Sequence, residues 1–104
     1  MSAGNWKELY QASTEGNLDL VRYHIREGVD PNYQHPEILM TPLVAAILNG
    51  HLHVVLFLLE KGADPGLESY FDNLTPLQAA KKMKNKELIN TLKEIYLTNK
   101  VNLN

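Results

Sequence analysis

The 104-residue sequence contains no cysteine, so it has no disulfide bond, no thiolate nucleophile and no cysteine ligand for a metal. Long hydrophobic runs are also missing. The longest, residues 54–59, is far shorter than the roughly 20 residues that a membrane-spanning helix needs. The N-terminal residues lack the apolar stretch of a secretion signal. We therefore expect a soluble, cytoplasmic protein without a membrane segment.

A strong net charge is absent as well, because 10 basic and 12 acidic residues leave a formal charge of −2. This balance argues against unspecific attraction to nucleic acid or anionic membranes. The charge is nevertheless uneven: residues 1–80 carry 10 acidic and 4 basic side chains (−6), whereas residues 81–104 carry 2 acidic and 6 basic ones (+4). The Lys81–Lys86 cluster leaves nucleic-acid binding open as an alternative function, although it is more typical of a solvated helix end.

Motifs that carry chemistry are scarce. The glycines stand singly rather than in a phosphate-binding loop, and no carboxylate or histidine has a partner placed for acid–base catalysis. His51 and His53 form an H-x-H pair, but a metal site also needs a third ligand, and the two rings diverge at the start of a helix. We therefore predict a protein that is not an enzyme and that has no metal or cofactor.

What the sequence does contain is a unit of two short helices at residues 41–65. Its first helix is predicted to begin at Thr41 and Pro42, because threonine caps helices well and proline suits the first helical position. This helix is expected to end at residues 49–50, where a glycine follows an asparagine. A second helix, apolar on most of its circumference, is predicted over residues 51–60. Such a pair needs neighbours stacked on it to cover its apolar surface.

The same unit recurs on both sides at a spacing of 34 residues. This shift places Gly16 on Gly50, and it places the Thr-Pro-Leu that begins at Thr75 on the one that begins at Thr41. Unit one lacks Thr-Pro-Leu, but Asn5 with the glutamate three residues later resembles a capping box. The units are expected at about residues 5–38, 39–72 and 73–97, with a frayed polar tail at 98–104.

The Thr-Pro-Leu, Gly-His and Gly-Ala-Asp of the central unit resemble the ankyrin-repeat family, whose T-P-L-H-x-A signature recurs about every 33 residues. The resemblance implies an all-α repeat fold, an ankyrin solenoid of three helix-turn-helix units with β-hairpin-like finger loops. It implies one domain over residues 1–104. Because the first and last units are more polar than the middle one, we expect them to be end units of a complete small protein.

Several residues depart from the family pattern. Val44 stands where the family has the histidine that ties neighbouring repeats together, so we expect a less rigid contact between repeats. The glycine expected before each Thr-Pro-Leu is replaced by Leu39 and Asn73. Leucine adopts the left-handed conformation poorly, so finger one is expected to turn differently. His24 is predicted to be a solvated residue of an end unit, and Leu56 is a candidate for an exposed apolar patch.

The resemblance also implies a non-enzymatic protein–protein interaction module, which binds a protein partner through the fingers and the exposed side of the first helices. Four residues of this predicted binding surface are expected to form one apolar strip: Ile38, Leu48, Phe71 and Met83. Packing as core beneath the fingers is the alternative for Met40 and Leu74. We expect a monomer, with self-association through Leu56, Phe57 or the finger aromatics as the second function. Carried over to this sequence, the whole predicted surface comprises Trp6, Thr14, Glu15, Glu37, Ile38, Met40, Leu48, Asn49, Tyr70, Phe71, Leu74, Lys82 and Met83.

Overall fold

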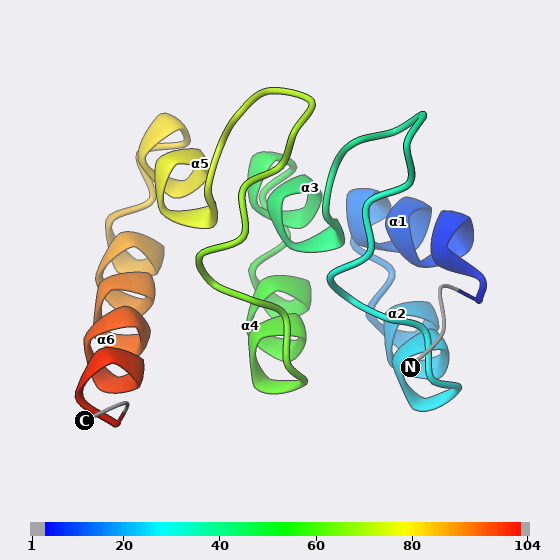
Figure 1. Cartoon of the computed structure of the whole chain (residues 1–104), viewed down its shortest axis with the longest axis horizontal. Helices are drawn as coiled ribbons and strands as arrows, with labels where there is room; N and C mark the ends of the chain where they lie inside the picture. Colours follow the sequence, from blue (N-terminus) through cyan, green and yellow to red (C-terminus); the bar gives the residue numbers. More distant parts are fainter. Residues whose placement is uncertain (1–3, 103–104) are drawn as a thin grey trace.

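The computed structural model describes residues 4–102, with the side chains of residues 4–98. Helices and loops alternate within this range. Figure 1 shows the helices in two layers, with α1, α3 and α5 above α2, α4 and α6. Each first helix packs on the second helix of its own unit and on the first helix of a neighbouring unit, which confirms the all-α repeat. The helices are α1 Trp6–Glu15, α2 Leu18–Arg26, α3 Pro42–Leu48, α4 Leu52–Glu60, α5 Pro76–Lys82 and α6 Lys86–Asn102.

The predicted threonine caps begin α3 and α5. Thr41 Oγ1 accepts a hydrogen bond from the backbone N–H of Val44 at 3.1 Å. Thr75 forms a full capping box with Gln78, whose side-chain oxygen accepts from the Thr75 N–H at 2.9 Å. The capping box expected at Asn5 is wrong: Asn5 has ψ 52° instead of the extended value of the threonines, and its side chain makes no cap bond.

The two long loops are finger one, residues 30–40, and finger two, residues 66–74. Finger two closes with a single antiparallel bridge between Ser69 and Leu74. Neither loop contains a regular strand in the described residues. The expectation that Leu39 avoids the left-handed conformation is wrong, because Leu39 (φ 59°) and Asn73 (φ 57°) both adopt it. The two fingers nevertheless close with different hydrogen bonds, since finger one has no counterpart of the Ser69–Leu74 bridge in the described residues. Leu39 is held there by its own N–H, which donates to the His35 carbonyl at 2.8 Å, and by the bonds its carbonyl accepts from finger two.

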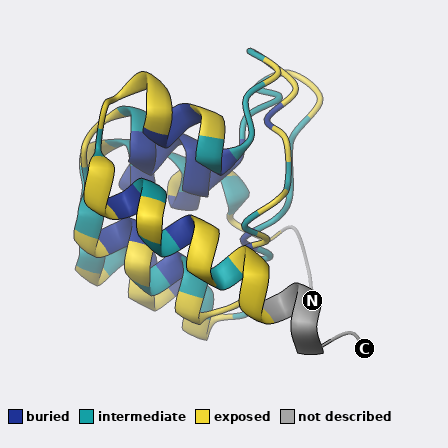
Figure 2. Cartoon of the chain, turned by 90° about the vertical axis from the view of Figure 1, so that its left-hand side faces the viewer, coloured by how far each residue is buried: buried dark blue, intermediate teal, exposed yellow. Residues whose placement is uncertain are grey.

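The core lies between the two helix layers, where Figure 2 shows the buried positions on their facing sides. Its largest fully buried side chains include Leu9, Leu43 and Leu58. The prediction that His24 is solvated is wrong, because the residue is only 3% exposed. It lies on the side of α2 that faces α1, at the position equivalent to the buried Leu58 of the next unit. His24 Nε2 lies 3.3 Å from Glu8 Oε1, but the two are not aligned for a hydrogen bond and Nε2 has no other partner among the described residues.

The last helix is longer than expected. The sequence predicts the third unit to end at residue 97 and a frayed tail to follow, whereas α6 continues through Asn102. Residues 98–102 contain no proline or glycine that would end a helix, so the ladder of hydrogen bonds runs on. The rest of the predicted tail, residues 103–104, lies outside the described residues.

Candidate protein-binding surface

The two fingers are joined by the side-chain amide of Gln34. Its nitrogen donates to the carbonyl of Glu68 at 3.0 Å, and its oxygen accepts from the N–H of Tyr70 at 3.1 Å. A backbone bond continues the contact, because the N–H of Phe71 donates to the carbonyl of Leu39 at 2.8 Å. Figure 1 shows both loops rising beside each other in front of the helices. The fingers therefore form one connected ledge.

A second amide, two residues earlier, holds the unit that follows. The Asn32 nitrogen donates to the Gly62 carbonyl at 3.1 Å, and its oxygen accepts from the Asp64 N–H at 2.8 Å. A shift of 34 places Asn32 and Gln34 on Gly66 and Glu68, so finger two lacks both amides. No role for either amide was predicted from the sequence. The difference between the two fingers at these positions was the signal that could have revealed it.

The Gly-His turn ties unit two to unit one. His51 precedes α4, and its Nε2 lies 2.9 Å from the carbonyl oxygen of Thr14, the predicted site residue near the end of α1. A nitrogen that carries the proton donates to this carbonyl. His51 also lies directly against Gly16, so a Cβ atom there would be 2.7 Å from ring carbons Cγ and Cε1. The histidine therefore fixes the end of the first helix relative to the second unit.

Beside finger one, a mostly apolar hollow of about 190 Å³ opens on the outer side of α1. Its residues on α1 follow the spacing i, i+3, i+4 and i+7, which places them on one helix face. The structure thus brings together Thr14 and Ile38, both predicted, with three residues that the prediction missed. That helical spacing was the signal that could have found them. The hollow is lined by Lys7, Tyr10, Gln11, Thr14 and Ile38.

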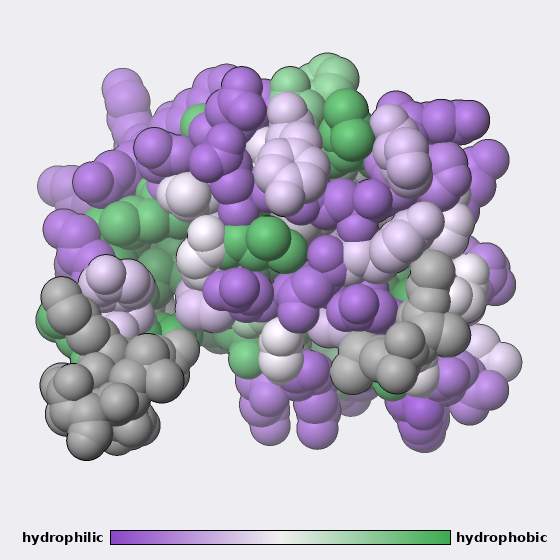
Figure 3. Space-filling model, in the orientation of Figure 1, coloured by the Kyte–Doolittle hydropathy of each residue, from purple (hydrophilic) through white to green (hydrophobic). Residues whose placement is uncertain are grey.

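The tip of finger two adds two exposed aromatic side chains to this region. Tyr70 is 59% exposed and Phe71 is 68% exposed, as expected for residues at the tip. The bond from the Phe71 N–H to the Leu39 carbonyl places this tip beside the residue that follows Ile38. Figure 3 shows apolar side chains at the top of the molecule, where the two loops approach each other. We call the five residues Tyr10, Thr14, Ile38, Tyr70 and Phe71 the finger surface.

Several predicted residues are partly covered instead. Trp6 stacks on His35, with ring centroids 4.0 Å apart and an interplanar angle of 11°. Met40 is half-buried, and its sulfur accepts from the Tyr10 hydroxyl at 3.7 Å. Leu48 and Leu74 pack against the core. The contacts of these four side chains stabilise the fingers and the helices. Because Leu48 packs against the core, less of its apolar surface is exposed in the predicted apolar strip.

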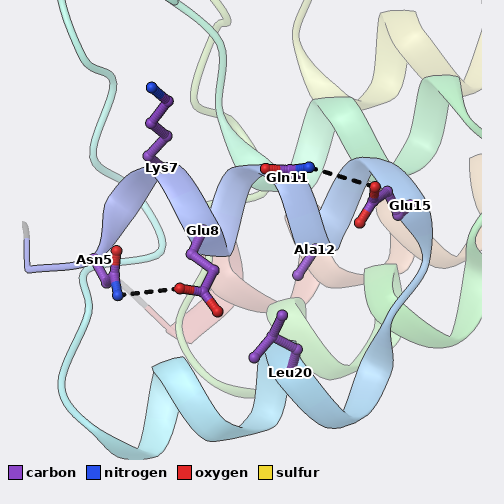
Figure 4. Close-up of a pocket in the computed structure, with 7 residues that line it drawn as sticks. All are labelled: Asn5, Lys7, Glu8, Gln11, Ala12, Glu15 and Leu20. Carbon is purple, nitrogen blue, oxygen red and sulfur yellow. Dashed lines mark hydrogen bonds between the residues drawn. The ribbon is translucent and has the colours of Figure 1, made fainter.

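Glu15 lies apart from its neighbour Thr14. It lines a second hollow, of about 420 Å³, between α1 and α2. Figure 4 shows Gln11 and Glu15 joined along α1 and Asn5 joined to Glu8, with hydrogen bonds of 3.5 and 3.2 Å. Four of the polar side chains of this hollow thus bind one another in two pairs.

The remaining predicted residues are exposed. Glu37 stands on finger one, and Asn49 ends α3 with its amide donating to the Ala45 carbonyl at 2.8 Å. Lys82 and Met83 lie at the end of α5, where Met83 is 45% exposed. None of these four residues lines the hollow beside Ile38, although Glu37 directly precedes Ile38 in finger one.

The described residues contain no cluster of three or more histidine, aspartate or glutamate side chains arranged to hold a metal. His51, from the H-x-H motif, contacts a backbone carbonyl instead, and His53 is exposed. Within residues 4–102, no helix combines the length and the apolar character needed to cross a membrane.

Paired helices stacked through their first helices, with finger loops projecting from one side, define a helical repeat protein. The family described as ankyrin repeats (3 copies) matches residues 9–104, so the chain belongs to the ankyrin-repeat family. No match was found among curated proteins. Ankyrin repeats are in general protein–protein interaction modules, and the family is typically non-enzymatic.

Proposed function

We propose that this chain is a non-enzymatic interaction module that binds a protein partner through its finger surface. The observation that carries the proposal is the exposure of Tyr70 and Phe71 on a ledge that Gln34 fixes in place. Aromatic side chains are enriched at interface centres, and an ordered loop loses less conformational entropy when it binds. The apolar hollow beside Ile38 supplies a concave site for a partner's side chain.

The test uses three versions of the full chain immobilised on resin and exposed to extract of the cells that encode it. The first is the wild type, and the second is the Tyr70→Ser, Phe71→Ser variant. The third, Tyr96→Ser, Leu97→Ser, removes a matched pair of side chains from α6 that are 59% and 58% exposed. Retained proteins are identified by mass spectrometry and then titrated as purified components.

A protein bound by the wild type and the α6 variant, and bound at least about tenfold more weakly by the finger variant, would support the proposal. Two truncated aromatic anchors commonly cost this much or more. Equal binding to all three versions would place the interface elsewhere, and binding to none would contradict an interaction module.

The two alternatives from the sequence stay predictions. Leu56 is 44% exposed on α4, which keeps self-association open, and sedimentation that shows only monomer at high micromolar concentration would end it. The lysines of residues 81–86 are exposed, which keeps nucleic-acid binding open. That binding would weaken steeply with salt, and the absence of any retarded DNA or RNA at low salt would contradict it.

A further inference from the structure

A third concave feature, a groove, lies between α2 and α4 in the layer of second helices and shares no residue with the finger surface. It encloses about 730 Å³, a size within the range of ligand pockets. Its walls combine cationic side chains with an aromatic ring and one aliphatic side chain. The residues that line it are Asp19, Arg22, Ile25 and Arg26 of α2, Phe57 of α4, and Lys61, which ends α4.

The groove gathers the positive charge of the acidic part of the chain. Residues 1–80 contain four basic side chains, Lys7, Arg22, Arg26 and Lys61, and the last three all line this groove. None of these three makes an ion pair with a carboxylate in the described residues, although Asp19 lines the same groove. Three cations therefore share one site with a single carboxylate, Asp19, and none of them is paired with it in the described residues.

The aromatic ring of Phe57 positions two of these cations. The guanidinium carbon of Arg22 lies 5.6 Å from the ring centroid and the Lys61 ammonium nitrogen lies 5.9 Å from it. Both distances are within the range of a cation–π contact. The cations are thus held beside an apolar surface formed by the ring and Ile25, which lines the groove next to it.

We propose that this groove binds an acidic peptide segment of a partner protein. Carboxylates of the segment pair with Arg22, Arg26 and Lys61, and an apolar side chain between them lies against Phe57. Arginine matches a carboxylate with two parallel hydrogen bonds, which suits this ligand.

The surrounding charge favours a short acidic segment over a nucleic acid. Residues 1–80 carry a balance of −6, and Glu27 and Glu60 directly adjoin Arg26 and Lys61 in the sequence. A long polyanion that extends beyond the groove would meet this excess of negative charge, whereas a short segment with a few carboxylates places its charge at the three cations. Charge complementarity therefore favours a short peptide with a few carboxylates, and Phe57 favours one that has an apolar residue among them.

The test titrates the ¹⁵N-labelled full chain with the peptide GSDELDDSG and follows backbone amide shifts. Two control peptides change one property each: GSNQLNNSG removes the charge and GSDEGDDSG removes the apolar side chain. We expect saturable shifts around Arg22, Phe57 and Lys61 with GSDELDDSG, and binding at least about threefold weaker with either control, since each removes part of the recognition.

Two charge-matched variants locate the binding. Arg22→Gln, Lys61→Gln should weaken the peptide about fivefold or more, as expected for two lost ion pairs, whereas Lys81→Gln, Lys82→Gln should leave it unchanged. Equal weakening by both variants, shifts centred on the lysines of residues 81–86, or tighter groove binding by an oligouridine probe would each overturn the proposal. The Tyr70→Ser, Phe71→Ser variant should bind the peptide normally, so this result is independent of the finger surface.

Discussion

The side-chain oxygen of Gln34 accepts a hydrogen bond from the backbone N–H of Tyr70 at 3.1 Å, across 36 positions of the sequence. The same amide donates to the Glu68 carbonyl, so one side chain satisfies a donor and an acceptor in the neighbouring finger. Finger two has only one bridge of its own, between Ser69 and Leu74. Its order therefore depends on finger one, and the exposed aromatics at its tip depend on the same contact.

We predict that Gln34→Ala loosens finger two. The two lost hydrogen bonds are partly exposed, so the free energy of unfolding should fall by about 1 kcal/mol. Amide hydrogen exchange at Tyr70 should accelerate much more than exchange in the core. Gln11→Ala is the control, because it truncates a surface amide whose only side-chain bond to another described residue is a 3.5 Å contact with Glu15. Unchanged exchange at Tyr70 in Gln34→Ala would show that the amide does not hold the finger.

The helices and their order could be predicted because their signals are local. Thr41 and Thr75 cap helices at the expected positions, and the spacing of 34 residues carries the pattern from one unit to the next. The predictions that failed for Leu39 and His24 depend on tertiary contacts. Leu39 adopts a conformation that leucine alone disfavours, because bonds to finger two and to His35 hold it there.

The candidate site was predicted less completely for the same reason. Phe71 and Ile38 could be placed near each other from the repeat pattern. The amides of Asn32 and Gln34 act across units, and their only sequence signal is that finger two lacks them. Whether Trp6 is free to bind could not be known either, since its stacking on His35 depends on how finger one folds back.

Gly16 and Gly50 allow a matched test of the contact between units one and two. Both have φ 77°, so an alanine at either site should lose about 1 kcal/mol of stability through backbone strain. A Cβ atom at Gly50 meets nothing within 4 Å, whereas one at Gly16 meets the His51 ring. We expect Gly16→Ala to cost about 1 to 3 kcal/mol more than Gly50→Ala in urea denaturation. Equal losses would show that the His51 ring moves aside freely.

Lys84 offers a stabilising change at the corresponding turn of unit three. It has φ 57°, and the repeat spacing places it on Gly16 and Gly50. Lys84→Gly should relieve the strain of a side chain in the left-handed conformation and raise the free energy of unfolding by about 0.5 to 1 kcal/mol. Lys82→Gly, inside the last turn of α5, should lower it by about 1 kcal/mol. A loss of stability in Lys84→Gly would contradict the strain assigned to this turn.

His24 is a buried polar side chain at a position where the next unit has a buried leucine. Its Nε2 is close to Glu8 but lacks an aligned hydrogen bond, whereas Leu58 is fully buried without any polar requirement. Replacing a buried, poorly satisfied polar group with an apolar one of similar size removes its desolvation cost. We therefore predict that His24→Leu raises the free energy of unfolding by about 1 to 2 kcal/mol, measured by urea denaturation.

Glu8 provides the control for this change. Its side chain is 47% exposed and also bonds to Asn5, so water and Asn5 can solvate it when the histidine is absent. Glu8→Gln alone should change stability by less than about 1 kcal/mol, as is usual for a contact made by a partly exposed carboxylate. The same change should have no further effect in the His24→Leu background. A net loss of stability in His24→Leu would mean that the contact with Glu8 outweighs the cost of burying the imidazole, and the first unit would then depend on this pair.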